Sequence, residues 1–251
     1  MTLPGIPSDQ LNSVLAAGRG EVGTLFVSMA RKHPDGRDAE YLRWHTLDHR
    51  PEQHRLPGVR ASVRLVSTPQ CRAARLAAAS GPDARFDDID HVMTYFFTDR
   101  TGLRAFNDLS TALGDGGRKL PLLPPVQRGV YTVMTKTAAP RVKVGSDVLP
   151  WWPFRGVVLL LETAGDAPTG LTDVDGVAGV WSATSHRVDA SLASAGEGQV
   201  LTYCFTDDDP ARVAGRLAPL LARRWAAGDA QPLLAAPFHP VVPHEWDRYV
   251  P

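Results

Sequence analysis

The sequence of 251 residues contains few cysteines, no excess of charge and no long apolar run. Its two cysteines, Cys71 and Cys204, lie in separate apolar segments, which is typical of buried thiols in a reducing compartment and disfavours a disulfide framework. The 27 basic and 27 acidic residues balance, so no net field attracts nucleic acid or an anionic membrane. The longest apolar run, 157–161, is far too short to cross a bilayer.

Targeting and nucleotide-binding motifs are missing as well. Residues 1–10 have neither the basic nor the apolar region of a signal peptide. The Gly-rich stretch 114–119 follows a helical pattern and precedes Pro121, whereas a phosphate-binding loop lies between a strand and a helix. We therefore expect a cytoplasmic protein whose partner is a small-molecule ligand. Nucleic acid and membrane partners are not expected, and the protein partner would be at most a second copy of the chain in a homodimer.

Two pairs of similar segments occur in the same order in the two halves of the chain. Residues 93–99 (MTYFFTD) resemble 201–207 (LTYCFTD), and both read as strands that end in an aspartate suited to cap the following helix. Residues 56–63 resemble 174–181, where a Gly turn leads into an alternating strand. The sequence therefore predicts two diverged copies of one unit.

The remaining elements complete the first copy but not the second. In the first half, strands are predicted at 24–30 and 129–136, and helices at 38–53 (opened by an Asp38 cap), 70–79 and 102–113. In the second half, a strand is predicted at 156–162 and a helix at 210–225. In the second half, 163–175 reads as a loop, so that copy lacks the first helix. The order βαββαβ predicts an α+β fold of tandem ferredoxin-like units, with the second copy degenerate.

These elements divide the chain into three expected segments. They are a ferredoxin-like unit at 20–136, a connecting segment at 137–155 and a second, degenerate ferredoxin-like unit at 156–251. The adjacent Trp151 and Trp152 predict that the connection packs against the body, because two such rings bury a large area. The Pro- and aromatic-rich stretch 237–251 predicts an irregular C-terminal arm.

Trp44, His49, Pro51 and the Leu-Pro-Gly turn at 56–58 follow one another in the first half. Their order and spacing resemble the EthD-like branch of the dimeric α/β-barrel superfamily, and the resemblance extends over about 24–136. It implies that the sheets of two ferredoxin-like units form a barrel of the dimeric α/β-barrel type, with a pocket between sheet and helices. Relatives in that superfamily include cofactor-independent cyclases, monooxygenases, isomerases and lyases. Because the second half lacks the Trp and His, one principal site is expected.

The helix at 38–53 carries an unusual set of side chains for an element that packs on a sheet. At 100° per residue, one broad face contains Tyr41, Trp44, His45, Asp48, His49 and Glu52, and the opposite face contains Arg43, Thr46, Arg50 and Gln53. A purely structural helix would present Leu, Ile or Val to the sheet. The aromatic, imidazole and carboxylate face indicates a pocket wall, in which Tyr41 and Trp44 would bind substrate.

His49 is the candidate general acid or base, because imidazole titrates near neutral pH and Asp48 or Glu52 could tune it. The alternative is a histidine with a structural role only. His45 lies four residues before His49, and this spacing also suits a metal. There is no H-E-x-x-H motif, and only His54 or His91 could supply a third ligand. We therefore expect no metal and treat His45 as a second polar pocket residue, with a solvated position as its alternative.

The strand at 91–98 alternates, so His91, Met93, Tyr95 and Phe97 share one face. His91 and Tyr95 could therefore add an imidazole and a phenol to the substrate-binding site. A core position for Tyr95 is the favoured alternative, since its counterpart Tyr203 occurs in a half without the helix.

The leading hypothesis is a cofactor-independent enzyme of the cyclase, lyase, isomerase or monooxygenase type. It would act on a small apolar or aromatic carbonyl compound with His49 as acid or base, assisted by His45 and Asp48. One alternative is a haem-associated protein, because two fused ferredoxin-like units also resemble the plan of chlorite-dismutase-like proteins, with His186 as candidate ligand. The other alternative is a non-catalytic small-molecule-binding protein.

Overall fold

The computed structural model of the protein describes residues 4–8, 22–78, 81–163, 165–188 and 192–251. Half of the stretch 1–10, in which we looked for a signal peptide, lies outside these residues, as do residues 20 and 21 of the first expected unit and residue 79 of the expected 70–79 helix. In the described part of the chain, none of the helices is both long enough and apolar enough to span a membrane.

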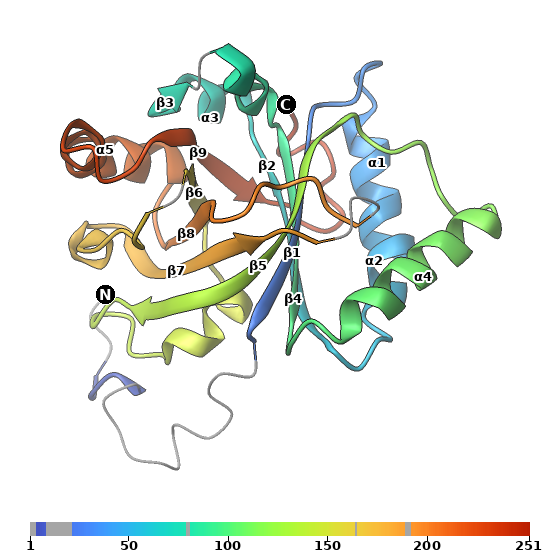
Figure 1. Ribbon diagram of the computed structural model, residues 1–251, viewed down its shortest axis with the longest axis horizontal. Helices are drawn as coiled ribbons and strands as arrows, with labels where there is room; N and C mark the ends of the chain where they lie inside the picture. Colours follow the sequence, from blue (N-terminus) through green and yellow to red (C-terminus); the bar gives the residue numbers. More distant parts are fainter. Residues whose placement is uncertain (1–3, 9–21, 79–80, 164, 189–191) are drawn as a thin grey trace.

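A closed barrel of eight antiparallel strands forms the centre of the described structure (Figure 1). The strand order is β2-β4-β1-β5-β7-β8-β6-β9, and β9 returns to β2 through the pairs Leu65–Pro240 and Val66–His239. The strands are β1 (Thr24–Ala30), β2 (Val59–Val66), β4 (His91–Phe97), β5 (Pro125–Ala138), β6 (Gly156–Glu162), β7 (Val177–His186), β8 (Val200–Thr206) and β9 (Pro232–Pro240). The two-residue β3 (Ala77–Ala78) adds to the free edge of β9.

Both halves of the barrel have the same strand order. In the first half the order β2-β4-β1-β5 places the second, third, first and fourth strands side by side, and β7-β8-β6-β9 does the same in the second half. This is the arrangement of the ferredoxin-like βαββαβ unit. The β5–β7 and β9–β2 ladders join the halves into one barrel, which confirms a mixed α+β fold.

The helices lie outside the barrel, on opposite sides of it (Figure 1). They are α1 (Asp38–Trp44), α2 (Arg50–Gln53), α3 (Pro69–Ala73), α4 (Gly102–Asp115) and α5 (Pro210–Ala226), with short 3-10 segments at Gly81–Asp88, Ser146–Trp151 and Leu171–Asp173. Figure 1 shows α1, α2 and α4 together beside the first half and α5 beside the second. Among the described residues, the helix layer of the first half therefore consists of the α1–α2 segment and α4, and that of the second half consists of α5.

Apolar side chains fill the barrel interior. Phe96, Trp181, Tyr203 and Phe205 are fully buried there, and the hydroxyls of Thr94 and Tyr203 are 2.5 Å apart. Met93, Tyr95 and Phe97 instead pack outside the sheet, against α4. The alternation predicted for the strand at 91–98 is thus confirmed, because its odd-numbered residues face the helices.

The aspartates expected to cap helices have other partners. The Asp38 carboxylate accepts hydrogen bonds from the His33 amide and from His91 Nε2, both at 2.8 Å. Asp207 pairs with Arg141, and Asp209 caps α5 instead. The cap predictions were wrong because other donors, the His33 amide and the Arg141 guanidinium, compete for these carboxylates.

Asp99 likewise does not occupy the N-cap of α4. Its carboxylate accepts hydrogen bonds from the amide and hydroxyl of Thr101, which is the residue that precedes the helix. The cap position is thus two residues later than the sequence pattern indicated.

The C-terminal arm begins later than predicted. Pro237 lies inside β9 and pairs with Val158 of β6, although proline cannot donate a ladder hydrogen bond. On its other side, β9 pairs among the described residues only near residues 234–235 and 239–240, so Pro237 faces a gap between these partners, where the missing donor is tolerated.

Two further predictions need correction. The Ala-rich helix ends at Ala73, because Leu76 and Ala77 pair with Ala235 of β9 and this pairing overrides helix propensity. In the connecting segment, Trp152 is half-buried beside Ala178, but Trp151 is 51% exposed. The connection is packed, therefore, through one of its two tryptophans.

Candidate functional site

The predicted helix at 38–53 is continuous but contains one π-helical turn, His45–His49, between α1 and α2. The Arg50 amide donates to the carbonyl of His45, five residues earlier. Pro51 explains this turn, since its ring has no N–H and would collide with the Leu47 carbonyl in a regular helix. The turn holds the His45 and His49 rings on one side of the helix, with ring centres 5.6 Å apart.

A cavity of about 450 Å³ lies between the outer face of the first-half sheet and its helices. Strands β1, β2, β4 and β5, helices α1 and α4, the chain at 119–126 and the segment at 192–194 all contribute to its walls. The lining residues are Phe26, Ser28, Ala30, Tyr41, His45, His49, Arg64, Met93, Tyr95, Phe106, Asn107, Ser110, Lys119, Leu122, Leu123, Pro125, Val126, Arg128, Leu192 and Ser194. The body of the cavity is apolar and aromatic, which suits a small organic ligand.

His49 enters the cavity from the π-helical turn and is only 8% exposed. Its ring stacks on Trp44 with centres 5.2 Å apart, and its Nε2 lies 3.5 Å from the side-chain nitrogen of buried Gln53. Burial, followed by the positive charges of Lys119 and Arg64, lowers the pKa of His49 to about 4, although the Asp48 charge opposes this. The imidazole is therefore neutral at neutral pH and free to accept a proton.

His45 is the second imidazole in the cavity wall and is almost fully buried. Its ring stacks on Tyr41 with centres 6.0 Å apart. Burial and then the charge of Arg64 hold the pKa of His45 well below its ordinary value. Both imidazoles thus stay uncharged in a wall that already contains cationic side chains.

The ionised side chains that line this cavity have one sign. Arg64, Lys119 and Arg128 are cationic, and no described aspartate or glutamate is among the lining residues. The Lys119 ammonium lies 3.4 Å from the Ser110 hydroxyl, on α4. The electrostatic potential in the cavity therefore favours a ligand, or a transition state, with negative charge.

Four of the seven residues that the sequence analysis placed in the site line this cavity: Tyr41, His45, His49 and Tyr95. Tyr95 is 3% exposed, and its hydroxyl has no hydrogen-bond partner among the described residues. Burial raises the pKa of Tyr95, so the phenol stays protonated and can donate to a ligand. Its ring also packs on Phe106, so the core role and the pocket role coincide.

The other three do not line the cavity. Trp44 supports the His49 ring from behind and donates from Nε1 to the Arg118 carbonyl. Asp48 forms an ion pair with Arg118 at 3.0 Å, so it acts on His49 only through its charge. His91 is fully buried against Asp38.

The predicted division of the helix into two faces was partly wrong. Thr46 and Gln53, expected on the face opposite the pocket, are buried, and Leu47 is half-exposed. The π-helical turn rotates the residues that follow it relative to a 100° repeat, and α2 also packs against α4.

The cationic lining residues were not among the residues predicted from the sequence. A signal for Arg64 exists, because it occupies an outward position in the alternating strand β2 where the helix layer covers the sheet. Lys119 ends the Gly-rich stretch 114–119, which serves as a connection as predicted but also brings this lysine to the cavity. Only the fold places these two segments together.

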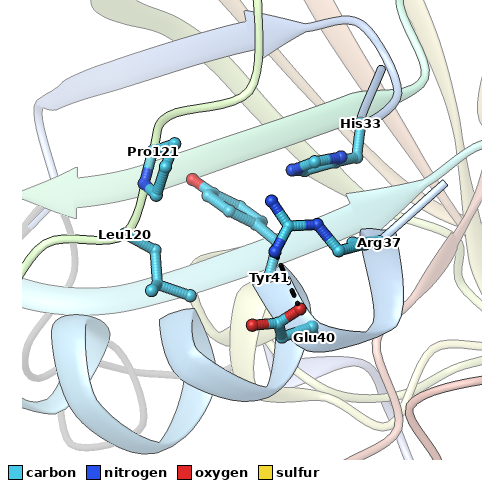
Figure 2. A pocket seen from close by; sticks show the side chains of 6 residues that line it. All are labelled: His33, Arg37, Glu40, Tyr41, Leu120 and Pro121. Carbon is cyan, nitrogen blue, oxygen red and sulfur yellow. Dashed lines mark hydrogen bonds and ion pairs between the residues drawn. The ribbon is translucent and has the colours of Figure 1, made fainter. Parts of the chain in front are cut away.

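Tyr41 separates the cavity from a much smaller pocket of about 20 Å³ at the start of α1. Figure 2 shows its ring between Pro121 on one side and His33 on the other, with Arg37 paired to Glu40 nearby. The small pocket can hold little more than a water molecule. The Tyr41 side chain thus lies between the two pockets, and the larger cavity is the candidate site.

In the described part of the second half, side chains of the helix lie directly on the sheet. Leu217 and Leu221 of α5 pack directly on Val158 and Leu160 of the sheet. His186, the candidate haem ligand, is not among the residues that line the cavity. Its Nε2 is buried and has no hydrogen-bond partner among the described residues, and haem binding at His186 stays a prediction. In the described part of the chain, no three His, Cys, Asp or Glu side chains form a cluster suited to a metal ion.

No family model matches the sequence, and neither does any curated protein. Among solved structures, an anthrone oxidase-like protein is similar, with a TM-score of 0.53, 13% identity and coverage of 88% of this chain and 92% of that chain. A chlorite dismutase-like protein (TM-score 0.47, 13% identity, 87% and 94% coverage) and a dye-decolorizing protein from V. cholerae (TM-score 0.43, 12% identity, 88% and 94% coverage) are also similar. The similarity to the anthrone oxidase-like protein shows a shared fold, and the expected mixed α+β barrel is confirmed at the level of fold.

Proposed function

We propose that the protein is a cofactor-independent enzyme that moves a proton on a small apolar or aromatic carbonyl compound, with His49 as the base. The observation that carries the proposal is a neutral imidazole in the wall of an apolar cavity whose ionised lining residues, among those that the structure describes, are cationic. A base must be uncharged to accept a proton, and the product of proton removal from a carbonyl compound is an enolate anion. Both requirements are met in the same cavity.

The chemical step is proton abstraction from carbon next to a carbonyl group or conjugated with one. The C–H bond breaks, its electron pair moves toward the carbonyl oxygen, and the proton goes to the His49 imidazole. Lys119 is the cation with the strongest influence on His49, and its ammonium would stabilise the new oxyanion. Return of the proton to another carbon completes an isomerisation, and attack of the carbanion on a second carbonyl completes a cyclisation.

A pKa of about 4 makes His49 a weak base before a ligand binds. Negative charge that develops beside the ring attracts the imidazolium and raises this pKa during the reaction. The cations that depress the pKa therefore stabilise the enolate, and the enolate stabilises the protonated base.

Anthrone is a suitable first test compound, because it is a flat aromatic ketone with an acidic CH₂ group and a fold neighbour is described as anthrone oxidase-like. Hydrogen–deuterium exchange at this CH₂ would be followed by NMR in deuterated buffer without oxygen. We expect the wild-type protein to accelerate exchange and His49→Gln to lower the rate by about a hundredfold to ten-thousandfold.

His54→Gln is the matched control, because His54 lies at the end of the same helix, bonded to Ser62, and does not line the cavity. This variant should exchange at the wild-type rate. Exchange that is equally fast in His49→Gln would contradict the proposal. Saturable binding of anthrone without any acceleration would instead favour the non-catalytic small-molecule-binding alternative, and a Soret band after incubation with haem would favour the haem-associated one.

We also propose that the two halves arose by internal duplication, and that the first half belongs to the EthD-like branch. The shared strand order and the two repeated sequence segments support the first proposal. The order of Trp44, His49 and Pro51 on one helix supports the second. In this view the second half closes the barrel, and the first retains the site.

A further inference from the structure

Arg64 has an unusual environment for an arginine in a folded protein. It lies on the outer face of β2, is 5% exposed and lines the cavity. Its guanidinium carbon lies 5.4 Å from the centre of the Tyr41 ring, over the ring face. A buried guanidinium normally has a carboxylate or several carbonyl oxygens as partners, because an unpaired charge is costly to remove from water.

No such partner of Arg64 exists in the described part of the chain. The described residues include no carboxylate within 4.0 Å of its guanidinium, and its Nε has no hydrogen-bond partner there. Other poorly exposed arginines differ: Arg75 pairs with Asp87 and Asp90, and Arg224 pairs with Glu162. Arg64 thus retains hydrogen-bonding capacity on the cavity side.

The neighbours of Arg64 in the cavity do not provide the missing negative charge. The ionised lining residues that the structure describes are cationic, and burial together with the Arg64 charge holds the pKa of His45 well below its ordinary value, so this imidazole is neutral. The remaining wall around this end is aromatic or apolar, with Tyr41, Met93 and Tyr95. A ligand that suits this end therefore has an anionic group attached to a flat apolar body.

We propose that Arg64 is the anchor of an anion subsite that binds the carboxylate of an aromatic acid inside the cavity. The planar guanidinium can donate two parallel hydrogen bonds to a carboxylate, and the Tyr41 ring holds it in place from one face. This inference rests on the proposed function, since it assigns a substrate class, aromatic keto acids, to the same cavity. Arg64 would bind the acid group, while His49 and Lys119 act on the carbonyl part.

The test is a calorimetric comparison of two probes, 2-naphthoate and its neutral amide, 2-naphthamide. We expect wild-type protein to bind the acid about tenfold to a hundredfold more tightly than the amide, the range expected for hydrogen bonds to a charged group. Arg64→Gln should lose this preference while its affinity for the amide stays within about threefold of wild type. Arg60→Gln is the matched control, because Arg60 is exposed on the same strand and does not line the cavity.

Equal wild-type affinity for both probes, failure of the acid to bind at millimolar concentration, or an acid preference that persists in Arg64→Gln would each overturn the inference. Equal wild-type affinity for both probes would refute the inference even if Arg64→Gln does not fold. In that case Arg64→Lys, which keeps the charge but lacks the planar pair of donors, tests the anchor, and an undiminished acid preference in Arg64→Lys would also overturn the inference. The acid preference should also persist in His49→Gln. If wild type prefers 2-naphthoate to 2-naphthamide but does not accelerate exchange of the anthrone protons, only the catalytic proposal is refuted. If it accelerates this exchange but binds both probes equally, only the anion subsite is refuted.

Discussion

Acidification should destabilise the protein through His49. The folded-state pKa of about 4 lies below the ordinary value of 6.5, so the unfolded chain binds more protons than the folded one between these values. The free energy of unfolding must then fall as pH falls through this window. Between about pH 7 and about pH 5, these two pKa values give a loss of about 2 kcal/mol from His49 alone.

Urea unfolding at the two pH values measures this loss. His45 and other buried histidines also contribute to the wild-type loss, so the informative quantity is the difference between wild type and His49→Gln. We expect the variant to lose about 2 kcal/mol less than wild type on acidification. His244→Asn is the control, because His244 is exposed and asparagine tolerates its left-handed backbone. An equal pH-dependence of wild type and His49→Gln would refute the assignment of a buried, neutral imidazole.

Three further predictions concern the barrel and the cavity. Gly179→Ala would place a Cβ 2.4 Å from Leu149 and 2.8 Å from a backbone oxygen. We therefore expect the free energy of unfolding in urea to fall by about 1–3 kcal/mol, and an unchanged urea midpoint would contradict the close packing at this position. Tyr203→Phe would leave the buried Thr94 hydroxyl without its partner and should destabilise by about 1–3 kcal/mol; a neutral effect would mean that this bond does not stabilise the barrel. Ser28→Leu should fill part of the cavity and weaken naphthamide binding in calorimetry without lowering the melting temperature, and wild-type affinity would place the ligand elsewhere.

Much of the fold could be predicted because strand and helix periodicities are local. The strands at 24–30 and 156–162 have the predicted bounds, since their runs of β-branched and aliphatic residues are interrupted by turn residues. The C-terminal strand β9 could not be predicted, because its prolines argue against a strand unless the gap beside Pro237 is known. The end of the Ala-rich helix at Ala73 likewise depends on pairing with a segment far away in the chain.

The candidate site could be predicted where one element determines the direction of a side chain. Helical spacing brought Tyr41, His45 and His49 together, and strand alternation added Tyr95. The spacing failed after His49, because a proline-induced π-helical turn changes the phase of the helix. Arg64 and Lys119 were missed for another reason, since only the closed fold brings β2 and the chain at 119–126 to the same cavity.

The account depends most on His49 as the base of a proton transfer. The most direct measurement is the pH profile of kcat/KM for exchange at the anthrone CH₂, because this ratio reports the pKa of the base before the substrate binds. We predict a rate that rises with pH through a midpoint at about 4 and stays constant up to neutral pH, and the rise should be absent in His49→Gln. A midpoint near the ordinary histidine value, or the same profile in His49→Gln, would contradict the account.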